Sequence, residues 1–312
     1  MQGAMNKTTE RRNPCSLDGL LLLDKPVGLT SNSALQKVKK LFRSKKAGHT
    51  GSLDPLASGM LPVCFGEATK FSRYLLTAHK CYRVTATLGI RTITGDSEGN
   101  ILSEKKVPPL TLERIDSVLS QFRGEIQQVP PMYSALKYKG QPLYELARQG
   151  IEVVRKSRGI KVDKLILLNF QNHNIEFELH CSKGTYVRTM VDDLGEMLDC
   201  GAHVSSLRRL TVGSYSENDM VNLSTLEEAK NYLNLNNYVK PIRVIVSHFP
   251  TVEVTSTIAR SIRQGQAVRI PVTPPTEDFV QIVQKNGNFL GVAQVLKGGK
   301  IAPHRLLKET IP

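Results

Sequence analysis

The alternation of apolar and polar positions along the chain predicts a mixture of strands and helices. The apolar run that opens GLLLLDKPVGLTSN (19–32) is typical of a short buried strand, followed by a turn at Lys25-Pro26-Val27-Gly28. Apolar and polar residues alternate along KCYRVTATLGIRTITGDSEGN (80–100), which predicts a strand that ends in a Gly/Asp turn. Strand-like patterns also dominate residues 160–181. Elsewhere, apolar residues recur at helical spacing over 32–43 and 111–124, which predicts two amphipathic helices. The chain therefore carries both periodicities.

Glycine and proline interrupt these patterns most densely at AGHTGSLDPLASG (47–59). Glycine adopts positive φ at little cost and proline lacks a backbone donor, so this segment is predicted to be an ordered loop. Its single carboxylate, Asp54, supports two interpretations. It fits the N-cap of a helix that begins at Pro55. It also fits a catalytic group on a loop held by a rigid scaffold.

Residues 125–150 form a second irregular segment, in which Pro130 and Pro131 break any regular element. We predict a projecting loop followed by a short helix. Three of the nine tyrosines crowd among lysines in this segment: Tyr133, Tyr138 and Tyr144. Such interleaving favours base stacking and contact with a nucleic-acid backbone. Simple packing of the loop by these rings is the ordinary alternative.

The character of the sequence changes near residue 250. A capped helix, STIARSIRQG (256–265), precedes short glycine-punctuated strands and the hairpin turn KNGN (285–288). This pattern predicts a small β-barrel-like unit. The predicted organisation is a disordered N-terminal tail (1–18), a large domain (19–249) and this small domain (250–312).

Charge narrows the class of partner. The 312 residues carry a formal net charge of +14, and the first 50 contain ten Lys or Arg against three Asp or Glu. Within them, KVKKLFRSKK (37–46) holds six basic residues and no acid. Such an excess favours nucleic acid, because phosphate contacts supply most non-specific affinity. A membrane partner is not expected, since this helix lacks an aromatic face and no apolar run reaches about 18 residues.

Several other chemistries find no support in the residue pattern. The five cysteines are scattered and never spaced C-x-x-C, which favours a reducing compartment and argues against disulfides. His173, His180 and Cys181 lie close in sequence without the spacing of a metal motif, so no metal is expected. The phosphate-binding glycine loop and the serine-hydrolase elbow are both absent from the sequence. The N-terminus has no apolar stretch, so no signal peptide is expected.

Five blocks of sequence resemble the TruB family of tRNA pseudouridine synthases in their order and spacing. They fall within residues 19–215 and read LLLDKPVGLTS, GHTGSLDPLASGMLPVCFGEATKF, KCYRV, PPMYSALKYKGQPLYELARQG and GTYVRTMVDDLG. The glycine loop around Asp54 is by itself a specific signature of this family. The C-terminal unit is similar to the RNA-binding PUA domain of bacterial members.

This resemblance implies a fold and an activity. The fold is of the α+β class: a mixed, mostly antiparallel sheet with flanking helices, the pseudouridine synthase fold, joined to a small β-barrel-like PUA domain. The reaction isomerises uridine 55 in the TΨC loop of tRNA to pseudouridine, by base flipping, glycosidic cleavage and rejoining through C5. The family uses no cofactor. Its partner is the TΨC stem-loop of tRNA, on which residues 125–150 would close.

The resemblance also implies roles for individual residues. Asp54 is the catalytic carboxylate, acting at C1′ as a nucleophile or at C2′ as a base. Arg188 pairs with it, and a nearby guanidinium is expected to lower the pKa of Asp54. Tyr82 stacks on the target base and moves a proton at C5. The remaining implied contacts to the nucleotide are Lys25, His49, Tyr186 and Leu207.

Two other functions remain open from the sequence. An RNA-binding or RNA-folding module would use the same basic surface and tyrosines, but it would need none of Asp54, Tyr82 and Arg188. A pseudouridine synthase that works in a guide-RNA particle is the second alternative. Because the C-terminus carries no long lysine-rich tail, we expect a stand-alone bacterial-type enzyme instead, as a monomer in the cytoplasm.

Overall fold

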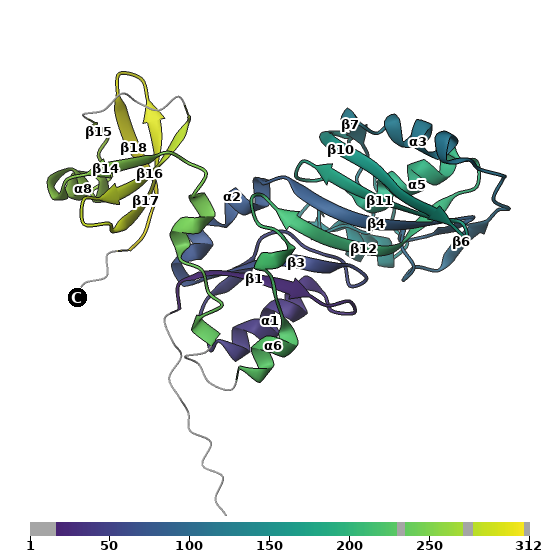
Figure 1. Ribbon diagram of the computed structural model, residues 1–312, viewed down its shortest axis with the longest axis horizontal. Coiled ribbons are helices and arrows are strands. Elements are labelled where there is room, and N and C mark those ends of the chain that lie inside the picture. The colour runs from purple at the N-terminus through teal and green to yellow at the C-terminus, as the bar shows by residue number, and fades with distance from the viewer. Residues whose placement is uncertain (1–16, 230–234, 271–276, 309–312) are drawn as a thin grey trace, which may run out of the picture.

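The computed structural model describes residues 17–229, 235–270 and 277–308. They form a large nine-stranded sheet, a five-stranded sheet and two small hairpins (Figure 1). Most of the predicted disordered tail, residues 1–16, lies outside the described residues. In the described part of the chain, no helix has both the length and the apolar character needed to cross a bilayer.

The large sheet runs in the order β13–β1–β3–β12–β4–β11–β10–β7, with β2 paired to β3. Among the described strands of this sheet, β1–β13 and β3–β12 are parallel pairs and the others are antiparallel, as predicted for a mixed sheet. The strands are β1 (Gly19–Lys25), β2 (Ala47–His49), β3 (Ser58–Phe65), β4 (Lys80–Leu88), β7 (Gly124–Gln128), β10 (Arg158–Gln171), β11 (Asn174–Cys181), β12 (Ala202–Val212) and β13 (Val221–Asn222).

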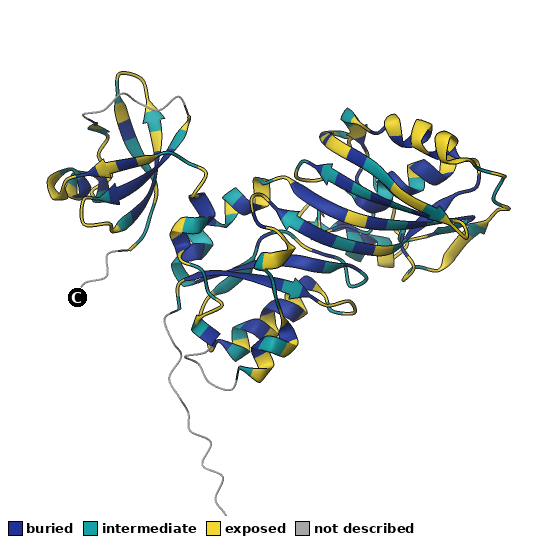
Figure 2. Ribbon diagram, viewed as in Figure 1, coloured by how far each residue is buried: buried dark blue, intermediate teal, exposed yellow. Residues whose placement is uncertain are grey.

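Both faces of this sheet are covered near β1, which explains the unbroken apolar run of that strand. Leu21 and Leu23 belong to one core cluster, whereas Leu20 and Leu22 belong to another. The first cluster includes side chains of α1 (Ser31–Leu41), α3 (Leu112–Ser120), α5 (Val187–Met197) and α6 (Leu223–Glu228). The second includes η1 (Gly66–Phe71), α2 (Ser72–Thr77) and η3 (Ile242–Val246). Figure 2 shows the buried positions concentrated along the central strands.

The predicted loop over 125–150 is wrong at its beginning. Residues Gly124–Gln128 form β7, an edge strand that pairs with β10 between Arg158 and Val162. Buried and exposed positions alternate only weakly along β7, so its own sequence does not identify it as a strand. It forms a strand because it pairs with β10, which begins about 30 residues further along the chain. The rest agrees with the prediction: a hairpin of β8 (Lys137–Tyr138) and β9 (Gln141–Pro142) leads into the short helix α4 (Leu143–Arg148).

The five-stranded sheet is built from residues after 250 and has its own core. Its curled form is consistent with the expected PUA-like unit (Figure 1). Aromatic side chains join it to the large sheet, since the rings of Phe71 and Phe289 lie 5.9 Å apart. The sheet order is β14 (Thr251–Val254), β16 (Phe279–Gln284), β17 (Phe289–Leu296), β18 (Lys300–Leu306) and β15 (Val268–Arg269), with α8 (Ser256–Arg263) beside it. The remaining short elements are β5 (Ile90–Thr92), β6 (Ile101–Glu104) and η2 (Glu217–Asp219).

Candidate active site

The loop that carries Asp54 is irregular but held in place. The Ser31 hydroxyl, at the start of α1, donates to the Leu53 carbonyl (2.9 Å) and accepts from the Leu53 N–H (2.7 Å). The described backbone forms no helix at Pro55. The N-cap interpretation of Asp54 is therefore wrong, and its carboxylate is available for other contacts.

A buried arginine, Arg209, holds the loop and the start of β3 through hydrogen bonds to their backbone carbonyls. Arg209, on β12, is 1% exposed, and it donates from Nε to the Met60 carbonyl (2.6 Å) and from Nη2 to the Gly51 carbonyl (3.1 Å). At Gly59 the backbone has φ of +97°, and a Cβ there would lie 2.3 Å from the Arg209 carbonyl oxygen. Only glycine fits that contact, because any side chain would collide with backbone. The glycines of the loop thus allow β3 and β12 to meet.

The Asp54 carboxylate pairs with a second buried arginine. Nε of Arg188, in the first turn of α5, lies 2.9 Å from Asp54 Oδ2 and 3.7 Å from Asp96 Oδ2. Its Nη1 and Nη2 donate to the carbonyls of Thr94 and Tyr133, both at 2.8 Å. A cation at a helix N-terminus is unfavourable by itself. The two carboxylates and two carbonyls compensate for this and hold the guanidinium in one orientation.

Burial in this site raises the pKa of Asp54 above its ordinary value near 3.8. The Arg188 guanidinium lowers the same pKa, as the sequence predicts, but it does not outweigh burial and the repulsion from Asp96. The net direction therefore differs from the predicted one. The Asp54 side chain keeps 41% of its surface exposed, so an incoming ligand can still reach it.

Tyr82, on β4, is the register partner of Arg209 on the neighbouring strand β12, and it is 9% exposed. Burial raises the pKa of the Tyr82 phenol, while Arg209 opposes that shift. Beside the ring is a hollow of about 300 Å³. Five of the seven predicted site residues line it: Asp54, Tyr82, Tyr186, Arg188 and Leu207.

The other two predicted residues do not line this hollow. Lys25 is wholly buried, and its ammonium donates to the carbonyls of Pro26 (2.8 Å) and Leu29 (2.7 Å). Burial lowers the pKa of Lys25 to about 8, against the attraction of Asp54. His49 ends β2, and burial with the nearby Arg209 lowers its pKa. Their contacts with a nucleotide stay predictions.

Three residues of the site were not predicted from the sequence. Asp96 is 3% exposed and accepts from Thr94 Oγ1 at 2.6 Å, although TGDSEG reads only as a turn. Gln128, on β7, receives the Tyr186 N–H (2.7 Å) and donates to the Tyr186 carbonyl (2.9 Å). Arg209 could have been found from the sequence. Because side chains alternate between the two faces of a strand, one arginine of the adjacent pair in SSLRRL must face inward.

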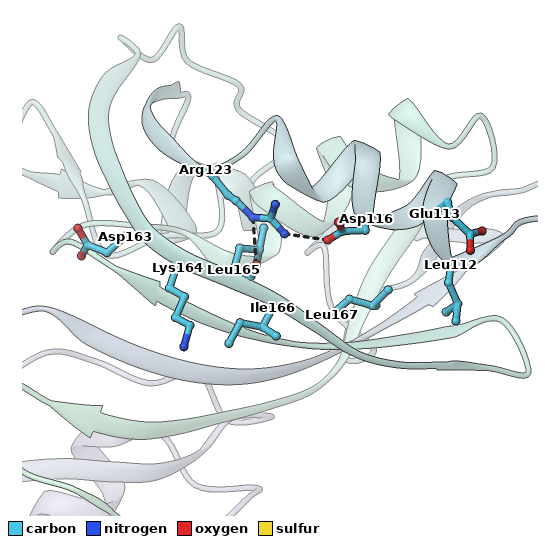
Figure 3. A pocket seen from close by; sticks show the side chains of 9 residues that line it. All are labelled: Leu112, Glu113, Asp116, Arg123, Asp163, Lys164, Leu165, Ile166 and Leu167. Atoms are coloured by element: carbon cyan, nitrogen blue, oxygen red, sulfur yellow. Dashed lines mark hydrogen bonds and ion pairs between the residues drawn. The ribbon is translucent and has the colours of Figure 1, made fainter.

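A larger hollow, of about 630 Å³, lies between α3 and β10 (Figure 3). No predicted site residue lines it. Its arginine, Arg123, donates to the Leu165 carbonyl (3.1 Å) and pairs with Asp116 (2.8 Å). Because five of the predicted site residues line the smaller hollow and none lines this one, we place the candidate active site at the smaller hollow.

The arrangement of the large sheet and its helices is the pseudouridine synthase fold, which solved structures share. A crystal structure of a Cbf5–Nop10–Gar1 complex is similar to this chain with a TM-score of 0.70 and 25% identity, covering 94% of this chain and 84% of that one. A structure of an H/ACA RNP bound to a substrate RNA containing 2′-deoxyuridine shares the fold at 23% identity, with a TM-score of 0.69 and coverage of 94% and 85%.

The family follows from the sequence comparisons. Residues 39–187 match the TruB family pseudouridylate synthase N-terminal domain, 188–247 the tRNA pseudouridylate synthase B C-terminal domain, and 250–307 the C-terminal region of pseudouridine synthase II TruB. The chain is 54% identical over 296 residues to tRNA pseudouridine synthase B of Coxiella burnetii, covering 94% of this chain and 96% of that one. It is 50% identical over 311 residues to the Yersinia pestis protein of that name, with coverage of 96% and 95%. The chain therefore belongs to the TruB family and is a pseudouridine synthase.

Proposed function

We propose that this enzyme converts uridine 55 in the TΨC loop of tRNA to pseudouridine. The observation that carries the proposal is the 2.9 Å Asp54–Arg188 ion pair, placed at a hollow that Tyr82 also lines. A tRNA substrate is supported by the names of relatives that are 50–54% identical over nearly the whole chain. The net charge of +14 suits so large a polyanion.

In the proposed mechanism, the target uridine leaves its stack and enters the hollow, where Tyr82 stacks on the base. The Asp54 carboxylate attacks C1′, or removes the proton from C2′, and the N1–C1′ bond breaks. The freed uracil then turns and C5 bonds to C1′; in the first route this displaces the Asp54 carboxylate from C1′, and in the second Asp54 returns its proton to C2′. The proton on C5 departs with the help of Tyr82, and N1 gains a proton, so the reaction is an isomerisation. The carboxylate must be ionised for the first step.

We further propose a division of labour along the chain. Residues 19–249 perform the chemistry, with 125–150 closing on the RNA, and residues 250–312 act as a PUA-like RNA-binding domain. The Tyr133 carbonyl already contacts Arg188, which supports a role for that segment near the reacting groups. Lys25 and His49 support the loop and the bound nucleotide from behind. A monomeric, cytoplasmic enzyme that acts on tRNA without a cofactor fits these roles.

The test is tritium release from unmodified tRNA that carries [5-³H]uridine, since C5–H is lost only if the base rejoins through C5. We expect release by the wild type and none by Asp54→Asn, with the Kd of the variant for tRNA within about tenfold of the wild type. Transcripts with cytidine at position 55 serve as the site control. Release from such transcripts would contradict the assigned position, and release by Asp54→Asn would contradict the mechanism.

A further inference from the structure

Arg158, the first residue of β10, packs over a tyrosine that lines the active-site hollow. Its guanidinium carbon is 4.8 Å from the centre of the Tyr186 ring, a cation–π contact. The guanidinium also lies beside Gly184: a Cβ at that position would be in ordinary van der Waals contact with Arg158, 3.6 Å from Cζ and 3.7 Å from Nη1, and its φ of +82° favours glycine. Both Tyr186 and Gly184 line the hollow, so Arg158 reaches its rim.

Side chains from the paired strands β7 and β10 contact both the backbone and the ring of Tyr186. Gln128 of β7 is opposite Arg158 of β10 in the antiparallel register. The Gln128 amide exchanges two hydrogen bonds with the Tyr186 backbone, while Arg158 covers the Tyr186 ring. The ring and the guanidinium are therefore positioned together, by the same edge of the sheet.

The charge of Arg158 is not neutralised within the structure. Among the residues that the structure describes, Arg158 forms no ion pair, and its buried Nε has no hydrogen-bond partner. The neighbouring Arg155 also has an Nε without a partner, but it forms an ion pair with Glu152 (3.4 Å), and Arg188 pairs with Asp54 (2.9 Å). A partly buried guanidinium without an acidic partner is costly unless an anion completes it. The position of Arg158 thus calls for an anionic group of the ligand.

We propose that Arg158 binds a backbone phosphate of the RNA next to the nucleotide that enters the hollow. This inference rests on the proposed function, because it requires that an RNA strand crosses the rim. A planar guanidinium can stack on a ring through its face and donate to a phosphate in its plane at the same time. Arg158 is then a positioning residue: it fixes the backbone beside Tyr186, so that the flipped base stays in the hollow.

The experiment measures the Kd for tRNA of Arg158→Gln, Arg158→Lys and Arg123→Gln across about 50 to 200 mM KCl. Arg123→Gln is the matched control, since it removes the same charge from a guanidinium that Asp116 already pairs. We expect Arg158→Gln to raise Kd about tenfold at low salt and to reduce the slope of log Kd against log salt by about 1. Arg158→Lys should keep the wild-type slope, with a Kd between those of the wild type and Arg158→Gln, because it keeps the charge and loses the planar fork.

The salt slope separates this inference from a purely structural role and from the proposed function. If Arg158→Gln has the same slope as Arg123→Gln, the phosphate contact is wrong, even if the affinity falls, because the side chain would then act only by supporting Tyr186. Tritium release by the wild type tests the proposed function separately. A wild type that binds tRNA but releases no tritium would reject the function while leaving the phosphate contact measurable.

Discussion

At the scale of residues, the carboxylate that we propose as the catalytic group shares its counter-ion. Asp54 and Asp96 both approach Nε of Arg188, at 2.9 and 3.7 Å, so one guanidinium serves two acids. Asp54 is the more exposed of the two and the one that lines the hollow. Burial and the charge of Asp96 raise the pKa of Asp54, so its reactive ionised form is lost at a higher pH than for an ordinary carboxyl group.

This arrangement predicts the effect of Asp96→Asn on the acid limb of the pH–rate profile. In the wild type, the single-turnover rate should fall as the pH drops through the raised pKa of Asp54. Asp96→Asn removes a like charge, so that limb should move to lower pH, while the maximal rate falls because Arg188 loses a partner. Asp116→Asn, whose partner Arg123 lies at the other hollow, is the control. An acid limb that stays at the wild-type pH in Asp96→Asn would show that Asp96 does not tune the reacting group.

Tyr82→Phe tests the phenol independently of the ring. The variant keeps the stacking surface, so we expect its Kd for tRNA to stay near the wild-type value. Tritium release should fall by roughly 100-fold or more, as for the loss of a general acid–base group. The measurement is single-turnover release at saturating enzyme. Wild-type release would reject a proton-transfer role for Tyr82.

At the scale of elements, the site depends on where β12 lies. This strand runs between β3 and β4, and its parallel pairing with β3 matches Arg208 to Ser58 and Arg209 to Gly59. The same strand contributes Leu207 to the hollow and Arg209 to the loop. One strand therefore connects the Asp54 loop to the strand that carries Tyr82.

Gly59→Ala should damage this junction. The new methyl group would meet the Arg209 carbonyl oxygen at 2.3 Å, in a backbone conformation that costs a non-glycine residue about 1 to 2 kcal/mol even without the collision. We expect a melting temperature several degrees lower and a strongly reduced turnover. Gly48→Ala is the matched control: nothing lies within 4 Å of a Cβ there, and its φ is not positive. Equal melting temperatures for the two variants would contradict the close approach of β3 and β12.

The sequence predicted where helices and strands lie better than it predicted which of them lie side by side. Periodicity reports which face of an element is buried, so the helices α1 and α8 were located within a few residues. It does not report which strand lies alongside, so β7 was read as loop. Gln128 and Asp96 were missed for the same reason, because their partners, Tyr186 and Arg188, are brought to them only by the folded sheet. The roles of Asp54, Tyr82 and Arg188 came from the resemblance to a family.

At the scale of the whole molecule, one apolar cluster spans the junction between the two sheets. The cluster that contains Phe71 also contains Val292 of the five-stranded sheet, and Tyr74 packs edge-on against Phe249 at 5.2 Å. Polar contacts reinforce the junction, since the Lys70 ammonium donates to the Leu306 carbonyl (3.1 Å). Removing the C-terminal sheet would therefore expose apolar rings on α2 and η1.

We predict that the full chain unfolds in a single cooperative transition. Because the junction core includes side chains from both sheets, neither part can lose its packing without exposing the other. Differential scanning calorimetry should show one peak, and Phe289→Ala should move it to lower temperature without splitting it. Two separate transitions in the wild type would show that the sheets are energetically independent.

The central place of β12 also sets the order of events during synthesis. β3 and β4 are consecutive in sequence, yet the strand between them leaves the ribosome only after residues 89–201 have been added. At roughly 5 to 20 residues per second, that interval lasts on the order of ten seconds. Throughout it, the nascent chain carries two unpaired strand edges, the kind of surface that other chains can bind. The Asp54 loop gains its hydrogen bond from Arg209 only after β12 has been made, so the candidate active site is completed late in translation.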